Sequence, residues 1–481
     1  MRTQTEDMNK VRESTDKPIT VEEVCLVRPN RASLQHQMYL SATDILMKSS
    51  KPPRTILFYP GEEDLNPVDH FATLKRGLSA VLVDYYPFAG RLVIDEESKR
   101  LALNCNDAGI ELILARCDSV HFSDLTSANY VPRRFFRQLA PMDTFSSSDQ
   151  VDVPVTAIQL TVFKGGMTVG IAIQHSVADG ISVWMFTKAL SDACRGQPST
   201  GFGPLHYRCL LKPDTVMLNK FPLKCASPKP DIFPCIDDCD ANGTHASGHG
   251  KQLFQVVLHF SREMIDTLKK ACESPHASSI SNPSQTCSFS TYQALSSYLW
   301  KRYILAKGFK GGTTVHLSIL LDVRNRIVPP LTSAYCGNAI VRMFTISTAY
   351  DIATESLGAT AARIRQTVRS TDDYWIKKFI MHLENGDLTR LPANVFRIRN
   401  AMHFPVYEAG DFGWGQPDRV RPPMSDLESR ATWYPCKDSQ GIDVLLAFSE
   451  KTYSRFFSAE LYSQDPLDIS KIGTRLSSAS P

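Results

Sequence analysis

Residues 154–194 hold two apolar runs separated by a glycine turn, followed by a helical pattern. The runs, Pro154 to Phe163 and Met167 to Gln174, have strong β character, and Gly165-Gly166 lies between them. Because the connection is short and rich in glycine, we expect the two strands to pair antiparallel. A helical pattern follows from Ile181 to Cys194. This order of elements predicts an α/β fold.

The length of the chain indicates how many domains to expect. At 481 residues it exceeds what one hydrophobic core usually supports, and 43% apolar with 21% charged residues is typical of a globular protein. Each half follows the same rough order of strands and helices, which predicts two α/β domains. The pattern breaks up in residues 201–250, where Pro, Gly, Ser and Asp are common. We expect a long crossover loop there, between an N-terminal domain, 20–200, and a C-terminal domain, 251–465.

Two local predictions concern elements outside the hairpin. Residues 100–103 and 110–115 read as strands, and the turn-rich loop 104–109 between them favours a second hairpin. Residues 353–369 read as one continuous helix.

Charge and cysteine usage exclude several classes of function. The 53 basic and 50 acidic residues are interspersed and give a net charge of +3, so we expect neither nucleic acid nor an anionic membrane as a partner. The N-terminus is polar, and no apolar run is long enough to cross a membrane. The 12 cysteines are spread singly, which favours reduced thiols. We expect a monomeric, cytoplasmic protein.

The strongest candidate for chemistry is His175. It stands at the end of the second predicted strand, and the turn Ser176 to Ala178 leads to Asp179 and Gly180. Turns of this kind display functional groups, and an imidazole can accept a proton near neutral pH. His175 is therefore a candidate general base, and Asp179 is its candidate partner.

Two motifs add a resemblance to a known family. Residues 174–180, QHSVADG, match an HxxxDG pattern, and Asp411-Phe412-Gly413-Trp414-Gly415 matches a DFGWG pattern. Together they resemble the plant-type BAHD acyl-CoA-dependent acyltransferases, over roughly residues 20–465. Further stretches similar to the family are YYPFAGRL at 85–92, STYQAL at 290–295 and DVRNR at 322–326.

The resemblance implies a fold and a reaction. The fold would be two chloramphenicol-acetyltransferase-like domains, each a mixed β-sheet with flanking helices, with a channel between them. Acyl-CoA would be a co-substrate, with no bound cofactor, and the acceptor a small metabolite. His175 would take a proton from the acceptor's hydroxyl or amine as it attacks the thioester carbonyl, and no acyl-enzyme would form.

The resemblance also implies roles for other residues. Asp179 would pair with an arginine, best matched by Arg324, and would support the turn together with Gly180. The motif Asp411 to Gly415 would be structural: its glycines permit a tight loop, and its tryptophan packs it.

One region departs from the family pattern. Residues 396–402 lack the tryptophan that many members carry before DFGWG, and one extra residue, Gly410, precedes Asp411. Arg399 and Asn400 are therefore candidates for the acceptor pocket. A cationic side chain there would favour an acidic acceptor, whereas exposure at the surface would give it no such role.

Other interpretations compete with the acyltransferase. A family member without activity could bind CoA or a metabolite as an interaction protein, and a metal-dependent hydrolase could use His175 and Asp179 as ligands. No metal is expected, because the residues at 235, 239, 245 and 249 (Cys, Cys, His, His) fit no zinc-finger spacing. KGFKGGTT at 307–314 is no phosphate loop. A kinase is excluded as well, because no catalytic-loop signature accompanies Asp411.

Overall fold

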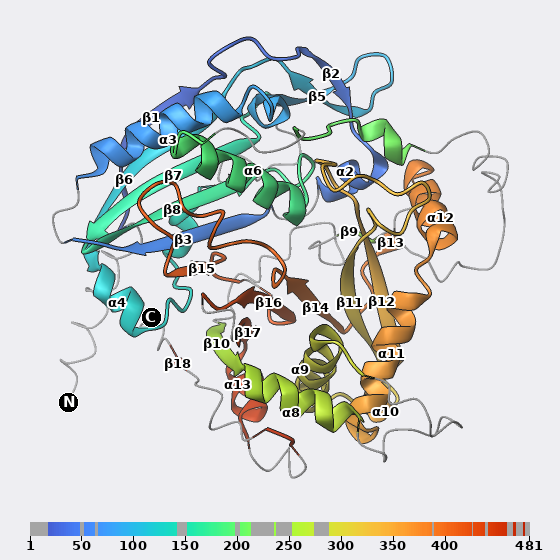
Figure 1. The fold of residues 1–481 in the computed structure, drawn as a ribbon. Helices are drawn as coiled ribbons and strands as arrows, with labels where there is room; N and C mark the ends of the chain where they lie inside the picture. Colours follow the sequence, from blue (N-terminus) through green and yellow to red (C-terminus); the bar gives the residue numbers. More distant parts are fainter. Residues whose placement is uncertain are drawn as a thin grey trace, which may run out of the picture.

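Two large β-sheets form the framework of the described residues (Figure 1). The structure is a computed structural model. It describes residues 18–48, 52–62, 66–141, 152–197, 203–212, 235–236, 253–273, 288–386, 389–425, 427–437, 441–458, 465–467 and 475–476.

The first sheet is built almost entirely from the N-terminal half. Its strands, in spatial order, are β1 (Thr20–Val27), β6 (Ile110–His121), β7 (Thr156–Lys164), β8 (Gly166–Ile173), β3 (Arg54–Pro60) and β15 (Arg419–Arg421). Strands β6 and β7 pair in parallel and the other neighbours antiparallel, so the sheet is mixed. Strand β15 comes from the C-terminal half and extends this sheet next to β3.

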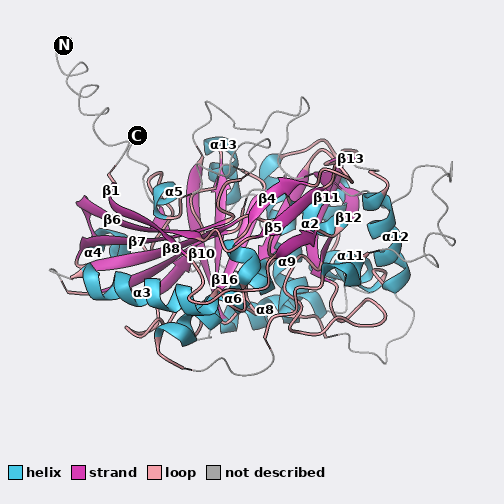
Figure 2. Cartoon of the chain, turned by 90° about the horizontal axis from the view of Figure 1, so that it is seen from above, coloured by secondary structure: helices cyan, strands magenta, loops and turns pink. Residues whose placement is uncertain are grey.

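The second sheet belongs to the C-terminal half and is also mixed. Its strands, in spatial order, are β12 (Ile340–Thr348), β11 (Thr314–Asp322), β14 (Val395–Asn400), β16 (Arg430–Pro435), β17 (Gly441–Phe448), β10 (Phe254–Ser261) and β18 (Arg475–Leu476). Strand β14 pairs in parallel with both of its neighbours. Figure 2 shows the two sheets side by side, with α3 and α12 toward opposite ends of the molecule.

Two small sheets and a set of helices complete the described residues. One small sheet joins β2 (His36–Tyr39), β5 (Leu101–Cys105) and β4 (Arg91–Ile94), and the other joins β9 (Cys235–Ile236) to β13 (Thr389–Arg390). The helices of the first half are α2 (Ala42–Met47), α3 (Pro67–Val81), η1 (Tyr86–Ala89), α4 (Phe122–Ser127), α5 (Phe136–Leu139), α6 (Gly180–Cys194) and η3 (Arg208–Leu211). Those of the second half are α8 (Arg262–Glu273), α9 (Thr291–Lys307), α10 (Ala349–Thr354), α11 (Leu357–Arg369), α12 (Asp373–Glu384) and α13 (Glu450–Phe456).

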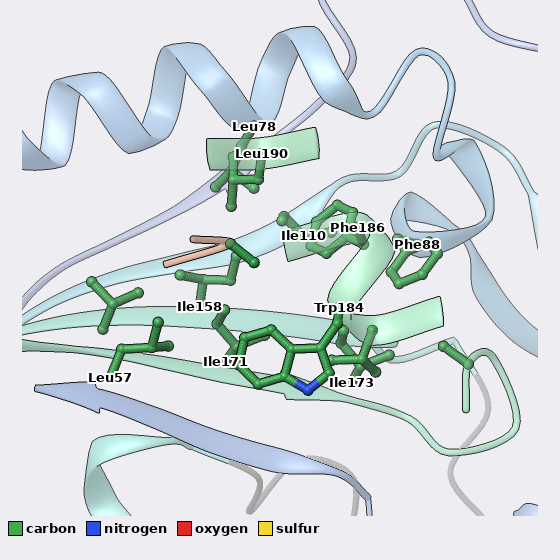
Figure 3. Close-up of a cluster of buried hydrophobic side chains, with 14 of the residues drawn as sticks. Leu57, Leu78, Phe88, Ile110, Ile158, Ile171, Ile173, Trp184, Phe186 and Leu190 are labelled. Atoms are coloured by element: carbon green, nitrogen blue, oxygen red, sulfur yellow. The ribbon is translucent and has the colours of Figure 1, made fainter. Parts of the chain in front are cut away.

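Helices cover both faces of the first sheet, and this explains why β8 is apolar along its whole length. On one face, Leu78 of α3 and Phe186 and Leu190 of α6 lie over Ile158 and Ile171 of the sheet (Figure 3). On the other face, α4 and α5 pack against β3 and β7. Every residue of β8 is buried. Each large apolar side chain buried in this way contributes roughly 1.5–3 kcal/mol to the stability of the fold.

The predicted α/β class with two mixed sheets and flanking helices is confirmed. The predicted hairpin at residues 154–174 and the helix after it are also observed. The domain bounds 20–200 and 251–465 remain predictions. Most of the predicted crossover, 201–250, lies outside the described residues, which include only 203–212 and 235–236.

The predicted hairpin between residues 100–103 and 110–115 is wrong. Strand β5 pairs with β2 and β4, whereas β6 pairs with β1 and β7 in the first sheet. The loop between β5 and β6 is held by a different neighbour: the guanidinium of Arg91 donates to the carbonyl of Gly109 at 2.8 Å. The chain therefore leaves one sheet and enters another instead of reversing within a sheet.

The predicted helix at 353–369 is interrupted. Helix α10 ends at Thr354, and Glu355 is extended with ψ 159°. Ser356 then starts α11, because its hydroxyl accepts a hydrogen bond from the amide of Ala359. A serine can thus cap a new helix inside a run that reads as one helix.

Candidate active site

His175 lies in a turn that directly follows β8. Its side chain and backbone are only 9% exposed. The side-chain oxygen of Gln174 accepts a hydrogen bond from the His175 amide at 2.9 Å, and the Val177 amide donates to the Gln174 carbonyl. The histidine is therefore held in a tight turn between a buried strand and helix α6.

Asp179 is the N-cap of α6 and forms a buried ion pair with Arg324. Its carboxylate accepts a hydrogen bond from the Ser182 amide at 2.9 Å. It also accepts two from the guanidinium of Arg324, at 2.8 Å and 3.1 Å. The Ala339 amide also donates to it, at 3.1 Å. Arg324 follows β11, so this pair links the two halves of the chain. Groups that hold the turn thus already bind both oxygens of this carboxylate.

Asn338 connects the backbone of His175 to the second half. Its side-chain amide donates to the His175 carbonyl at 2.7 Å and to Asp44 at 2.8 Å. The Asn338 carbonyl in turn accepts from the Thr43 hydroxyl at 2.8 Å. Asp44 and Asn338 are both completely buried. Three segments far apart in sequence therefore meet beneath the turn.

Arg208 is a second buried cation at this place. It donates to the Val177 carbonyl at 2.8 Å and lies 3.5 Å from Asp44, and the side chains of both charged residues are 0% exposed. Its guanidinium fills the space beside Gly337: a Cβ on that glycine would come within 1.2 Å of the arginine. Gly337 is therefore required by this close approach.

Each buried arginine beneath the turn has an aspartate partner: Asp44 for Arg208 and Asp179 for Arg324. Burial opposes the charge of Arg324, but the attraction and hydrogen bonds of Asp179, aided by Asp322, outweigh it and raise the pKa of Arg324. Burial likewise opposes the charge of Arg208, and Asp44 is the main group that raises its pKa. Both arginines stay charged, so the turn rests on two fixed ion pairs.

The segment after β14 closes over the start of α6. A Cβ on Gly180 would lie 2.8 Å from the ring of Phe404, and the rings of Phe404 and Trp184 are 6.5 Å apart. The small size of Gly180 is thus explained by the approach of Phe404. The candidate pocket residues Arg399 and Asn400 are the last two residues of β14 and are half-buried. The side-chain oxygen of Asn400 accepts from the Met402 amide at 2.9 Å.

The motif Asp411 to Gly415 lies at the opposite end of α6. The Asp411 carboxylate accepts from the amides of Gly413 and Gly415 at 3.1 Å each, and both glycines have positive φ, +110° and +94°. The Asp411 carbonyl accepts from the Ser191 hydroxyl at 2.7 Å. Helix α6 has 15 residues, so about 22 Å separate this loop from the His175 turn. At that distance the motif cannot take part in proton transfer at His175.

A surface depression lies beside the same loop. It has a volume of about 540 Å³ and is lined by residues of α3, the end of α6 and the motif, among them His70, Arg195 and Trp414. The rings of His70 and Trp414 are 4.9 Å apart. The depression is remote from His175, so we do not assign acyl transfer to it.

Within the described part of the chain, the group of metal-binding side chains that lie close together is His259, Cys436 and Asp443. His175 and Asp179 are not part of it. The cysteines and histidines at 235–249 fall outside the residues whose side chains are described. No helix among the described residues is long and apolar enough to cross a membrane.

Sequence reasoning missed Asp44 and Arg208 and gave Asn338 no role. The one local signal is Asp44, the only charged residue in the segment 37–47. A buried charge needs a partner, so this residue could have been singled out. Nothing in the sequence around Arg208 indicates its burial.

Comparison with known proteins found a matching family model and several similar chains. The model of the Transferase family matches residues 17–462. BAHD acyltransferase DCR of Arabidopsis thaliana is 30% identical over 362 residues, which is 72% of this chain and 70% of that protein. Shikimate O-hydroxycinnamoyltransferase of Nicotiana tabacum is 27% identical over 455 residues, which is 92% of this chain and 99% of that protein.

A solved structure shares the fold. F. graminearum TRI101 complexed with coenzyme A and T-2 mycotoxin matches with a TM-score of 0.70 at 18% identity, and the match covers 89% of this chain and 98% of that one. At this identity the likeness concerns the fold alone.

Proposed function

Because this chain belongs to the Transferase family, as a plant-type BAHD acyltransferase, we propose that it takes its acyl group from acyl-CoA with His175 as the general base. The protein transfers an acyl group to a small metabolite. The donor, the base and the choice between a hydroxyl and an amine acceptor are the proposed parts.

One observation carries the assignment of the base: both halves of the chain fix the backbone of the His175 turn. Asn338 holds the His175 carbonyl, Arg208 holds the Val177 carbonyl, and Arg324 holds Asp179. General base catalysis requires the accepting nitrogen to lie within hydrogen-bond reach of the proton that it removes. A turn tied at three points fixes the backbone from which the imidazole extends, which favours that geometry.

The proposed reaction is a direct transfer. As the acceptor's oxygen or nitrogen attacks the thioester carbonyl, its proton passes to the imidazole of His175. The carbonyl π electrons move to oxygen and give a tetrahedral oxyanion. When this collapses, the carbon–sulfur bond breaks and His175 returns the proton to the CoA thiolate. The histidine is unchanged after each turnover, and no acyl-enzyme is needed.

Two relatives support the substrate classes. The TRI101 structure contains coenzyme A and T-2 mycotoxin, and the Nicotiana tabacum enzyme is named as an O-hydroxycinnamoyltransferase. For this chain we propose a CoA thioester donor and a hydroxyl or amine acceptor. We propose Arg399 and Asn400 as part of the acceptor pocket, because the segment after them packs on Gly180 at the start of α6. The monomeric state and the cytoplasmic location remain predictions.

Replacing His175 tests the proposal. We expect His175→Ala to reduce acyl transfer by about 10²–10⁴-fold, because the proton then has no positioned acceptor. The wild type and the variant are incubated with a panel of acyl-CoA donors, alcohols and amines, and products are detected by mass spectrometry. His36→Gln, which changes an exposed histidine on β2, should retain full activity.

Two results would contradict the proposal. If folded His175→Ala retains wild-type rates, His175 is not the base. If the wild-type protein binds CoA but transfers nothing across the panel, the donor assignment fails and the interpretation as a non-catalytic binding protein returns. The family match favours the enzyme. The hydrolase alternative is disfavoured because Arg324 occupies the carboxylate of Asp179.

A further inference from the structure

Three side chains with metal-binding atoms converge on the second sheet, apart from the His175 turn. Nδ1 of His259 lies 3.0 Å from Oδ1 of Asp443, Sγ of Cys436 lies 3.4 Å from the same oxygen, and that sulfur lies 3.5 Å from Nδ1. All three atoms thus lie within hydrogen-bond or ligand distance of one another.

The sheet register brings these residues together. His259 on β10 is the direct partner of Asp443 on β17. Cys436 follows β16, and its amide donates to the carbonyl of Gly441 at 3.0 Å, which closes the connection from β16 to β17. His259 and Cys436 are 177 residues apart in sequence. No spacing motif could therefore have revealed the cluster.

The arrangement differs from that of a nucleophilic triad. In a triad, the nucleophile and the carboxylate contact different nitrogens of the histidine, so that a proton can be passed through the ring. Here Cys436 and Asp443 both face the same nitrogen, Nδ1 of His259. Three ligand atoms that face one another in this way are arranged as they would be around a metal ion.

The three separations agree with the edges of a zinc tetrahedron. Zn–N and Zn–O bonds of about 2.0–2.2 Å and a Zn–S bond of about 2.3 Å, at tetrahedral angles, place neighbouring ligand atoms roughly 3.3–3.6 Å apart. The observed 3.4 Å and 3.5 Å fall in this range, and the 3.0 Å contact lies slightly below it. Only a small outward movement of the imidazole would admit an ion.

A neighbouring arginine orients one of the three side chains, and solvent can reach the cluster through another. Oδ2 of Asp443 accepts from Arg421 at 2.7 Å, which orients the carboxylate with Oδ1 toward the cluster. Asp443 and Cys436 are buried, whereas the His259 side chain is 45% exposed and gives solvent a path to the cluster.

We propose that His259, Cys436 and Asp443 form a zinc site with three protein ligands and a fourth position for water. On binding, the Cys436 thiol loses its proton to solvent and the sulfur forms a bond to Zn²⁺. The ion joins β10 to β17 and to the chain between β16 and β17. The site is distinct from the proposed base, so the ion takes no part in the proposed acyl transfer.

Zinc binding by the full-length protein tests the site. Chelator-treated, reduced protein is titrated with ZnCl₂ by calorimetry, and with CoCl₂ while absorbance is followed, because a cobalt–thiolate bond gives a near-ultraviolet band. We expect one ion per chain and a higher melting temperature with zinc, since the ion binds the folded state. His259→Ala should weaken zinc binding by about 100-fold, and Cys436→Ala should remove the cobalt–thiolate band.

Two controls separate this site from other binding. His316→Ala, a half-buried histidine on β11 in the same sheet, should bind zinc like the wild type. The double variant Cys235→Ser/Cys239→Ser should also retain it. The proposal is overturned if wild-type protein binds no zinc, if His259→Ala keeps wild-type affinity, or if the double variant abolishes binding. Because His259 is exposed, its variant remains a test even if Cys436→Ala does not fold.

Discussion

At the scale of single residues, the environment of Asp179 determines its role. An aspartate four residues after a candidate base could orient the imidazole, and the sequence alone allows that interpretation. In the structure both of its oxygens accept hydrogen bonds from Arg324, and the backbone amides of Ser182 and Ala339 donate to it as well. Such a buried pair is costly to break, because the remaining partner keeps its charge without compensation. We therefore regard Asp179 as a positioning residue.

Asp179→Asn removes this charge while nearly preserving the shape of the side chain. We expect a loss of about 3–5 kcal/mol of stability, because Arg324 stays buried and charged. Urea unfolding measures the loss, and the pH–rate profile measures the base. The profile should keep its midpoint while the maximal rate falls, since His175 remains. Asp322→Asn is the matched control: it contacts the same arginine but is 37% exposed, so about 1 kcal/mol or less is expected.

The opposite pattern would contradict this role. A pH midpoint that moves by a full unit, with urea unfolding unaltered, would assign Asp179 to proton transfer.

At the scale of elements, helix α6 connects the two sequence motifs. Asp179 caps its first turn beside His175, and its last turn meets the Asp411 loop through Ser191 and Arg195. The loop belongs to the C-terminal half, so that half holds the helix at both ends. We propose that this loop sets the position of α6, and through it the position of the His175 turn.

Asp411→Ala tests this role of the loop. The change removes the acceptor of two backbone amides, Gly413 and Gly415, and we expect a loss of about 1–3 kcal/mol. Thermal and urea unfolding measure the loss, while the KM for donor and acceptor should stay within about twofold of wild type at temperatures where the variant is folded. Asp411→Asn keeps an acceptor oxygen and should lose less. A large rise in KM with unchanged stability would instead place the loop in substrate binding.

At the scale of the whole molecule, the sequence predicted elements that depend on neighbouring residues. It did not predict contacts between segments far apart in the chain. The β7–β8 hairpin and helix α6 follow from neighbouring residues and appear as predicted. The partner of β5 depends on which sheet the chain enters next, and turn chemistry does not encode that. In the candidate site, His175 was accessible to sequence reasoning. The buried cations and anions beneath it come from several segments, and only folding brings them together.

One of these joining segments also carries a histidine that should set the response of the fold to acid. Leu205 exchanges backbone hydrogen bonds with the second half: its amide donates to Ala334 and its carbonyl accepts from Cys336. The next residue, His206, contacts the first half, where its Nε2 lies 2.8 Å from the Asp84 carbonyl. Burial, aided by Arg208, lowers the pKa of His206 to about 4. The neutral imidazole therefore belongs to the folded state.

Protonation of His206 should destabilise the protein as the pH falls. The unfolded histidine has a pKa of about 6.5 and binds a proton more readily than the folded one, so stability is complete above about pH 6.5 and is lost toward pH 4. Between pH 7 and pH 5 the loss from this residue is about 2 kcal/mol. In His206→Gln the fall in unfolding free energy over that interval should be smaller by this amount, measured by urea titration at both pH values. All other titrating groups are common to the two chains and cancel in the difference, so equal falls in both proteins would show that His206 is not the group that responds.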